Sequence, residues 1–353
     1  DLVAARMFGP SQELVTSYAE LIRSSDDIWP EIREILSEYV ERELAPREDG
    51  QVHRVLMLLF EGENAIRRLR DAVGGFEDSI ESADTIRGTY GDYIRANDGS
   101  ITYFEPAVLS GPTVKFVKET LKIWADFSES DGGVLDNAIR LADDKDVQKT
   151  LVIIKPDNFT FPSSRPGNIM DIFSRSGLRL IGAKLLRMSL AEALEFYGPV
   201  QPVLREKLGK IAVERACKVL KEEFGFAMPP SVCDALEKTL GPTIGDHQFY
   251  SIMNFMTGQW APDVQDADRN EEGKVRCMTL VYAGENAVEK IRNILGPTDP
   301  SKAAPGSVRK EFGTDIMVNA AHASDSPENA LREIGIIKIQ QDTINRWYEQ
   351  YYS

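Results

Sequence analysis

The stretch that decides the fold is "GENAVEKIRNILG", Gly284 to Gly296, because the chain carries it twice. The earlier copy, "GENAIRRLRDAVG" from Gly62 to Gly74, aligns with it without gaps, and six of the thirteen positions are identical. At the same offset "HRVLMLLFE" aligns with "VRCMTLVYA" upstream, and "TIRGTYG" aligns with "SVRKEFG" downstream. Since the match runs through strand, helix, loop and next strand, it predicts two copies of one domain.

The second copy can be followed element by element. "TLVIIKP" is an apolar, β-branched run typical of a buried strand, and "GNIMDIFSRSG" has helical apolar spacing and a glycine stop. Strand "LRLIGAKLLRM", helix "SLAEALEFYG", strand "VRCMTLVYAG", helix "ENAVEKIRNILG" and a last short strand near Ile316 follow. The order βαββαβ predicts an α+β protein of two ferredoxin-like domains, each an antiparallel sheet covered by helices.

Composition and turn signals set the expected boundaries. The predicted units are an N-terminally incomplete first domain at 1–125, an acidic linker at 126–148, a second domain at 149–340 and a tail at 341–353. A helical insertion at 198–246 interrupts the second domain, with a Pro229-Pro230 break and a second short helix ending at Gly241. We interpret the insertion as a lid or an interface. Because "DLVAARMF" reads as a strand already under way, we expect a segment before Asp1.

The charge and the cysteines narrow the possible functions. A net charge of −15 argues against nonspecific binding to nucleic acid or anionic membranes, so any anion site must gather positive charge locally. Cys217, Cys233 and Cys277 form no CxxC, and we interpret them as reduced thiols, with a metal site that includes His247 as the alternative. An odd cysteine count, no signal peptide and no apolar run of about 18 residues predict a cytoplasmic protein without a membrane span.

Basic residues stand at the ends of three predicted elements. Lys155 ends a strand, Arg292 lies in the last turn of a helix, and Arg309 lies where a loop enters the next element. The phosphate-binding motifs GxxxxGK[ST] and GxGxxG are absent. In so acidic a chain, three cations at element ends indicate an anion site, although each one alone also fits a solvated surface charge.

The segment "NAAHASDSPENALREIG", Asn319 to Gly335, has two interpretations. Ser326 is a good helix N-cap and Pro327 a good first helical residue, so His322 could merely precede a capping motif. Alternatively, its imidazole is a nucleophile beside a helix N-terminus, where the free N–H groups and the helix dipole favour a phosphate.

Three motifs give the second copy a resemblance to a known family. From Thr150 to about Ile337 it resembles a nucleoside diphosphate kinase: "TLVIIKPD" is similar to the opening strand, "PTDPSKAAPGSVRKEFG" to a nucleotide-binding loop, and "NAAHASDSPENALREI" to the active-site histidine segment. Ala323 stands where the family usually has glycine. The resemblance implies a ping-pong reaction, in which a nucleoside triphosphate phosphorylates a histidine that then phosphorylates a nucleoside diphosphate.

The resemblance also implies roles for single residues. His322 would be the nucleophile, Glu333 would fix its tautomer, and Ser324 would support that geometry. The nucleotide-binding residues implied are Lys155, Tyr197, Phe249, Arg292, Thr298, Arg309 and Asn319. Of these, the three cations would neutralise phosphates, Tyr197 and Thr298 would donate hydrogen bonds to them, and Asn319 would reach the sugar. Mg²⁺ would be held through the nucleotide phosphates, with no metal site on the protein.

Two departures from the family concern the nucleoside clamp. Val318 stands where the family usually has arginine, and the best register puts Gln248 on its base-stacking phenylalanine, beside Phe249. The leading hypothesis is therefore a nucleoside diphosphate kinase with one working site. The alternative is a weak or inactive pseudo-enzyme that serves as a nucleotide-sensing or assembly module.

The first copy keeps some of these residues and lacks the nucleophile. Tyr18, Arg70 and Arg87 match Tyr197, Arg292 and Arg309, while Phe76 stands in the place of Thr298. No histidine lies between His53 and His247, so Ser100, Tyr103 or Ala107 takes the nucleophile's place, depending on the gap. We predict a catalytically dead copy that pairs with the second as an intramolecular pseudo-dimer. A further homo-oligomer, and nucleotide binding through Arg70 and Arg87, stay open.

Overall fold

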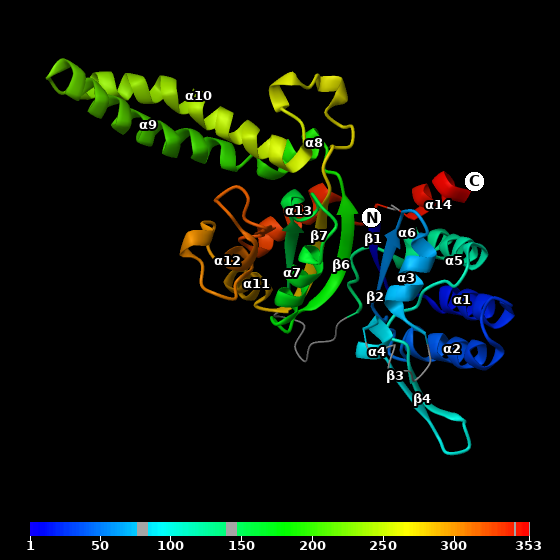
Figure 1. Ribbon diagram of the computed structural model, residues 1–353. Helices are drawn as coiled ribbons and strands as arrows, with labels where there is room; N and C mark the ends of the chain where they lie inside the picture. The colour runs from blue at the N-terminus through cyan, green and yellow to red at the C-terminus, as the bar shows by residue number, and fades with distance from the viewer. Residues whose placement is uncertain (76–83, 139–146, 342–343, 353) are drawn as a thin grey trace.

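The structure, a computed structural model, describes residues 1–75, 84–138, 147–341 and 344–352 (Figure 1). One six-stranded antiparallel sheet runs through the molecule in the order β2-β1-β6-β7-β5-β8. Its strands are β1 (Leu2–Phe8), β2 (Val55–Phe60), β5 (Val147–Ile154), β6 (Arg179–Leu186), β7 (Cys277–Glu285) and β8 (Ala321–Ala323). Counted within the second copy, the last four strands lie in the order 2-3-1-4, as a split βαβ fold requires, so the predicted fold class is confirmed.

Helices cover both faces of the second domain's sheet. Along β5, Leu151 and Ile153 pack into one apolar cluster while Val152 and Ile154 pack into the other, as the two-residue period of a strand dictates. The first cluster is covered by α8 (Leu190–Tyr197), part of α10 (Pro230–Thr257) and α13 (Pro327–Ile337). The second is covered by α7 (Arg165–Ser174) and α11 (Ala287–Leu295). The run is apolar because both faces of this strand are buried.

Short elements connect these layers. They are α12 (Val308–Phe312) and the 3₁₀ turns η3 (Pro156–Asn158), η4 (Ala261–Asp263), η5 (Asp266–Asp268) and η6 (Pro300–Lys302). The strand expected near Ile316 is in fact β8, several residues later. Ile316 lies in an exposed turn, in which the carboxylate of Asp315 accepts hydrogen bonds from the N–H groups of Met317 and Val318. That turn uses the backbone donors that a strand would need.

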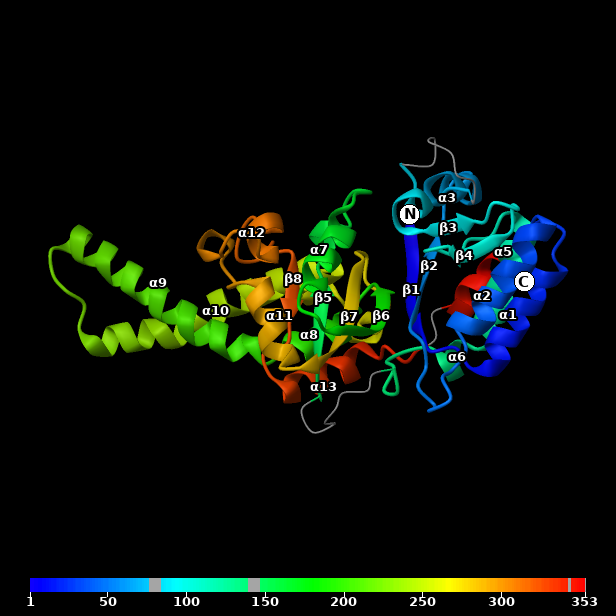
Figure 2. The same ribbon diagram turned by 90° about the horizontal axis from the view of Figure 1, so that it is seen from below.

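The insertion is a long helical hairpin that projects away from the sheet (Figures 1 and 2). It consists of α9 (Val200–Phe224) and α10 (Pro230–Thr257), so the predicted stop at Gly241 is wrong. The helix continues through Gly241 and Pro242 because the glycine serves close packing: a Cβ there would lie 2.9 Å from the carbonyl oxygen of Arg205. No helix among the described residues is long and apolar enough to cross a membrane.

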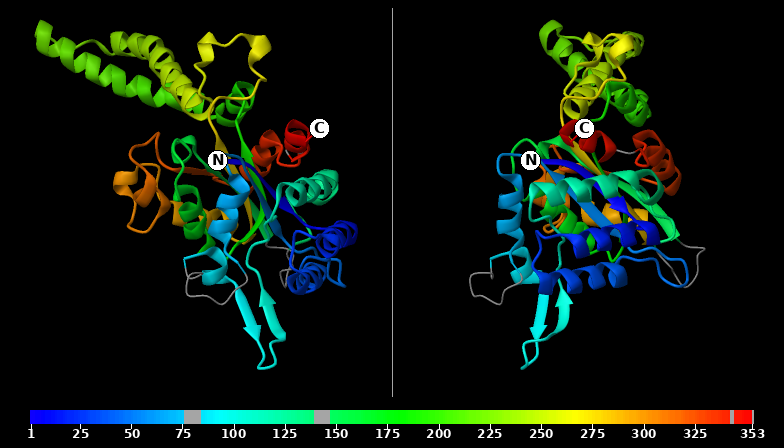
Figure 3. Two further views of the ribbon diagram at one scale, coloured as in Figure 1. Left: turned by 45° about the vertical axis from the view of Figure 1, so that its right-hand side comes forward. Right: turned by 90° about the vertical axis from the view of Figure 1, so that its right-hand side faces the viewer.

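The first domain contributes two strands to the common sheet. Its helices are α1 (Gln12–Ser24), α2 (Pro30–Glu43), α3 (Ala65–Val73), α4 (Ile86–Tyr90), α5 (Val114–Asp126) and α6 (Ser128–Asp131). Strands β3 (Asp92–Arg95) and β4 (Ile101–Glu105) form a separate hairpin that projects from the domain (Figure 3). The predicted tail is helix α14 (Ile344–Tyr352), which packs on α5 and buries Ile344 in the first domain's core, with Trp347 packed against that core.

The two copies meet where β1 lies beside β6. The offset that places Tyr18 on Tyr197 makes these equivalent strands, and they pair antiparallel at Arg6 and Lys184. Both cations are buried: Arg6 donates to the backbone carbonyls of Ser128, Ile339, Gln340 and Gln341, and Lys184 donates to those of Ile337 and Lys338. The last two carbonyls lie at the C-terminal end of α13, where the helix dipole favours a positive charge.

Candidate functional site

A cavity of about 710 Å³ opens beside β8, between α8, the start of α9, α11 and α13. Residues from chain-distant elements converge on it. The predicted site residues that line it are Tyr197, Arg292, Thr298, Arg309, His322 and Glu333. Two of the three predicted cations, Arg292 and Arg309, therefore lie in one cleft of an acidic chain.

His322 is held by both its backbone and its ring. His322 is the central residue of β8, and its backbone pairs with that of Ile153 in β5. Its Nε2 lies 3.1 Å from Oε2 of Glu333, and the hydroxyl of Ser324 donates to the same oxygen at 2.6 Å. An ionised carboxylate only accepts, so we assign the ring proton to Nε2, which leaves the lone pair on Nδ1. Nδ1 has no hydrogen-bond partner within the described residues.

Local sequence explains why Glu333 reaches the ring. The hydroxyl of Ser326 accepts from the N–H of Asn329 and starts α13 directly after β8. The helix then runs back over the strand and carries Glu333 to a position where its side chain is 6% exposed. The edge of the Phe196 ring packs on the imidazole, with ring centres 5.1 Å apart. The Ser326 cap therefore both starts α13 and determines where Glu333 meets His322.

Three buried donors of the cavity residues lack partners among the described residues: the Tyr197 hydroxyl, Arg309 Nε and Arg332 Nε. Arg309 donates to the carbonyls of Gly296 at 2.9 Å and Ala321 at 3.1 Å, while its Nε has no partner among the residues described. Burial, together with neighbouring Arg292, lowers the pKa of Arg309 to about 10, so it stays charged at neutral pH. The Tyr197 hydroxyl is likewise buried and unpaired within the described chain, and burial raises its pKa. Unsatisfied buried donors are costly, and an oxyanion would satisfy them.

Lys155 and Asn319 lie outside the cavity lining and brace its loops instead. Lys155 Nζ donates to Asn319 Oδ1 at 2.7 Å and to the carbonyl of Met317 at 3.1 Å. Asn319, 1% exposed, donates to the carbonyls of Thr298 at 3.1 Å and Ile316 at 2.8 Å. With its polar atoms engaged in this way, Asn319 is not placed to reach a sugar, and Lys155 holds a loop rather than facing the cleft. Burial, and then Arg309, lower the pKa of Lys155 to about 8.

The prediction that Phe249 contacts the base is wrong. Phe249 is 2% exposed and packs in the apolar cluster with Phe196, Met253 and Met256. Because α10 runs as one regular helix through this region, position 249 falls on the face turned toward the sheet. Its neighbour Gln248 lies on another side of the helix and is partly exposed.

Sequence reasoning missed several residues of the cavity wall, among them Phe196, Asp325, Asn329 and Arg332. Arg332 donates to the backbone carbonyls of Glu195 and Phe196, each at 3.2 Å, and lies 3.8 Å from Oε1 of Glu333. It therefore ties α13 to the end of α8. The available signal was the three-residue spacing of Asn329 and Arg332 in the predicted helix, which puts them on one helix face.

The backbone of the first copy repeats that of the second. Asn64 and Asn286 both adopt a left-handed conformation, with φ of 55° and 52°, and Gly74 and Gly296 have φ of 87° and 85°. Arg87 donates to the carbonyl of Gly74 at 2.7 Å, as Arg309 does to Gly296. The matched arginines thus play the same structural part in both copies.

Beyond Arg87, the backbone shows which residues of the first copy are equivalent to which residues of the second. Ala107 and Ala320 share a left-handed φ, of 56° and 69°, and the N-caps Thr113 and Ser326 lie at the same offset from them. In this register Leu109 takes the place of His322, Gly111 that of Ser324, and Thr120 that of Glu333. The expected replacements Ser100, Tyr103 and Ala107 are therefore wrong, because they precede the matching position. Phe76 lies outside the described residues.

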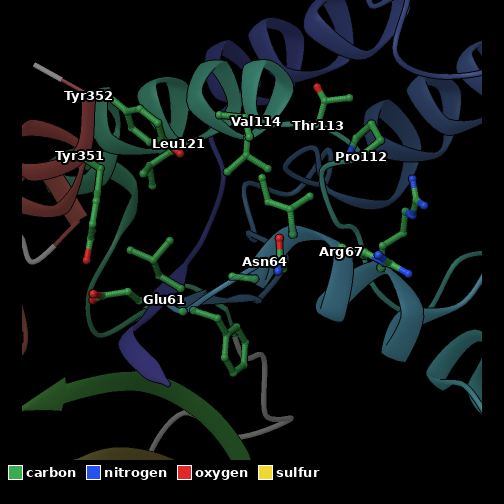
Figure 4. A pocket seen from close by; sticks show the side chains of 16 residues that line it. Glu61, Asn64, Arg67, Pro112, Thr113, Val114, Leu121, Tyr351 and Tyr352 are labelled. Atoms are coloured by element: carbon green, nitrogen blue, oxygen red, sulfur yellow. The ribbon is translucent and has the colours of Figure 1, made fainter.

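The first domain has a different cavity, of about 630 Å³, between α3, the start of α5 and α14 (Figure 4). Arg67 and Arg70 are among its lining residues, and Figure 4 shows Arg67 across from Tyr351 and Tyr352 of the C-terminal helix. Arg87 does not line it and instead donates to the backbone at Gly74, Pro106 and Val108. The cavity wall contains no imidazole.

Comparisons with known proteins show which family the chain is similar to. A family model described as nucleoside diphosphate kinase matches residues 269–342. A nucleoside diphosphate kinase of Campylobacter hominis is 31% identical over 188 residues, which cover 53% of this chain and 93% of the relative. One of Chlamydia trachomatis (serovar D) is 30% identical over 199 residues, covering 56% and 98%.

The solved structure of the Aquifex aeolicus nucleoside diphosphate kinase is 28% identical and covers 54% of this chain and 94% of its own. Its TM-score of 0.33 is too low to support an argument about the fold. The sequence relatives, by contrast, are matched over nearly their whole length, and the family model spans residues 269–342, which include His322. The chain therefore belongs to the nucleoside diphosphate kinase family.

Proposed function

We propose that the chain is a nucleoside diphosphate kinase with one working site, centred on His322. The observation that carries the proposal is the state of the imidazole. Its Nε2 is held by the buried Glu333, while Nδ1 keeps its lone pair beside a cavity with unpaired donors. A neutral imidazole with a free nitrogen is a competent nucleophile near neutral pH.

The reaction would proceed in two displacements. In the first, the Nδ1 lone pair attacks the γ-phosphorus of a nucleoside triphosphate, the bond from that phosphorus to the bridging oxygen breaks, and the diphosphate leaves. In the second, a terminal oxygen of another nucleoside diphosphate attacks the phosphohistidine, and the N–P bond breaks. In both displacements Glu333 accepts a hydrogen bond from the Nε2–H group of His322. Its carboxylate stabilises the positive charge that the phosphorylated ring carries.

The cavity wall supplies charge where the phosphates would lie. Arg292 and Arg309 line it together. The Tyr197 hydroxyl and the Arg309 Nε–H are unpaired donors among the described residues. The N-terminal end of α13, which also borders the cavity, favours an anion. This set suits negative charge that is spread over several oxygens in the transition state.

Mg²⁺ is expected to arrive with the nucleotide. No group of three or more His, Cys, Asp or Glu side chains among the described residues could hold a metal, whereas Asp325 borders the cavity. This donor set fits a cation that keeps its phosphate and water ligands rather than a protein cage. When bound, the ion would neutralise charge on the phosphates.

We assign the first domain a structural role. Leu109, Gly111 and Thr120 replace the three residues of the catalytic relay, and a leucine cannot form a phosphohistidine. The pairing of Arg6 with Lys184 joins equivalent strands, which supports an intramolecular pseudo-dimer. The pseudo-enzyme alternative rests on the nucleoside clamp, because Phe249 is buried and Val318 replaces an arginine.

Phosphorylation with γ-labelled ATP separates these possibilities. The wild-type chain should acquire label that is lost in acid and stable in alkali, and the label should pass to an added nucleoside diphosphate. His322→Ala should take up none, while His247→Ala, which removes an exposed imidazole outside the cavity, should label normally. Absence of acid-labile label, or label that persists in His322→Ala, would overturn the proposal.

A further inference from the structure

The two helices of the insertion approach each other unusually closely. A Cβ on Gly209 would lie 2.9 Å from the Cα of Gly241, and one on Gly245 would lie 2.5 Å from the Cα of Arg205. Both values are shorter than real contacts allow, so only glycine fits and the two backbones touch. The guanidinium of Arg205 also donates two hydrogen bonds to the carboxylate of Asp246, at 2.6 and 2.9 Å. These contacts fix the register of α9 against α10.

The same register brings two cysteines face to face. Cys217 follows Gly209 by eight residues (217 − 209), and Cys233 precedes Gly241 by eight (241 − 233), so both lie about two turns further along. Their Sγ atoms are 2.9 Å apart, and both side chains are partly exposed. The third cysteine, Cys277, is buried in β7 and lies apart from them.

We propose that Cys217 and Cys233 form a reversible disulfide that cross-links α9 and α10. Their Sγ atoms, 2.9 Å apart, need to approach by less than about 1 Å to reach the roughly 2.0 Å length of a disulfide bond. The glycine contacts at 209, 241 and 245 hold α9 and α10 at the close separation that lets the two cysteine side chains meet. The function of these glycines is then to set a distance as well as a register.

The oxidant is a small-molecule disulfide, such as glutathione disulfide. One cysteine thiolate attacks it, releases one glutathione thiol and leaves a mixed disulfide on the protein. The second cysteine thiolate then attacks the protein sulfur, and the second glutathione leaves. Two protein thiols are oxidised, one glutathione disulfide is reduced to two thiols, and the two protein thiol protons pass to the two released thiolates.

The cross-link closes the outer end of the hairpin and leaves the kinase cavity alone. The closed segment, residues 218–232, carries the exposed rings of Phe224 and Phe226 and the turn between the helices. Val200 borders the cavity, and Cys217 follows it by 17 residues (217 − 200), which is about 25 Å of helix. The inference is therefore independent of the proposed function.

The test is redox titration of the full chain with glutathione buffers, followed by intact mass and peptide mapping. The wild-type chain and Cys277→Ser should lose two hydrogens and yield a peptide that joins Cys217 to Cys233. Cys217→Ser and Cys233→Ser should instead gain one glutathione. The oxidised chain should be cut more slowly within residues 218–232 by a protease, and a reducing agent should restore the cutting rate.

A variant with altered helix packing tests whether the cross-link depends on the close contact between α9 and α10. Gly209→Val leaves both thiols in place but forces the helices apart, so it should gain glutathione without forming the cross-link, with helix content checked by circular dichroism. A wild-type chain that stays reduced, carries glutathione on both cysteines, or cross-links only between molecules would overturn the proposal. An unchanged rate of phosphotransfer upon oxidation is expected, since the site lies far from the hairpin tip.

Discussion

Replacing Glu333 by glutamine tests how the proposed nucleophile is oriented. In the wild-type chain a single carboxylate oxygen, Oε2, accepts from both His322 Nε2 at 3.1 Å and Ser324 Oγ at 2.6 Å. One carbonyl oxygen of a glutamine can therefore replace it and keep both hydrogen bonds. The amide nitrogen then occupies the place of Oε1, which lies 3.8 Å from Arg332. The tautomer of the ring and the fold should survive.

What Glu333→Gln removes is the charge. A hydrogen bond to a charged group contributes about 1.5–3 kcal/mol, against about 0.5–1.5 kcal/mol for a neutral one. The difference, about 1–2 kcal/mol, stabilises the positive ring of the phosphohistidine and the transition state that leads to it. At about 1.4 kcal/mol for each tenfold change, phosphorylation should slow by about 5- to 30-fold.

The assay is single-turnover formation of acid-labile label from γ-labelled ATP, with circular dichroism as a check on folding. Glu195→Gln is the matched control, because its side chain is exposed and only its backbone carbonyl contacts Arg332. The control should label at the wild-type rate. A wild-type rate in Glu333→Gln would refute the reasoning, since the carboxylate would then contribute nothing to the chemistry.

Three further predictions follow from the buried residues. The pKa of Lys155 is about 8 in the folded chain against an ordinary 10.5, so the folded state loses this proton at a lower pH than the unfolded state. The free energy of unfolding should therefore rise with pH between those values, by about 2 kcal/mol from pH 7.5 to 9.5. Urea unfolding should show this rise in the wild type, and its persistence in Lys155→Met would contradict the assignment. Phe249→Leu should lower the free energy of unfolding by about 1 kcal/mol and leave the KM for nucleotide unchanged, whereas a raised KM at full stability would restore its role at the base. In a His322→Ala background, Leu109→His should not restore acid-labile label, because Gly111 and Thr120 offer no carboxylate relay; recovered label would show that the first site lacks only its nucleophile.

Much of the fold followed from local patterns. The duplicated "GENA" helix, the β-branched strands and the Ser326 cap each act within a few residues. The convergence of Arg292, Arg309 and His322 on one cavity followed from the family resemblance. The roles of these residues, the base preference and the cytoplasmic location stay predictions.

The misplaced residues have a common physical reason: their environment depends on partners that the local sequence does not reveal. Phe249 was expected beside the base, but the continuous α10 turns it into the core. Asn319 was expected at the sugar, but Lys155, which precedes it by more than a hundred residues, holds its side chain. Gly241 reads as a helix stop in sequence, and only the presence of α9 makes it a contact.

The return of α14 to the first domain constrains how the protein is made. Ile344 is fully buried among residues that begin with Ala4 and Phe8, so the first domain's core includes side chains from both extremes of the chain. During synthesis the N-terminal domain emerges first, yet one of its packing surfaces stays bare until the whole second domain has been translated. Domains usually fold in the order in which they leave the ribosome. Here the first domain is completed only after the second domain has been synthesised, because the apolar surface of α5 must wait for residues 344–352.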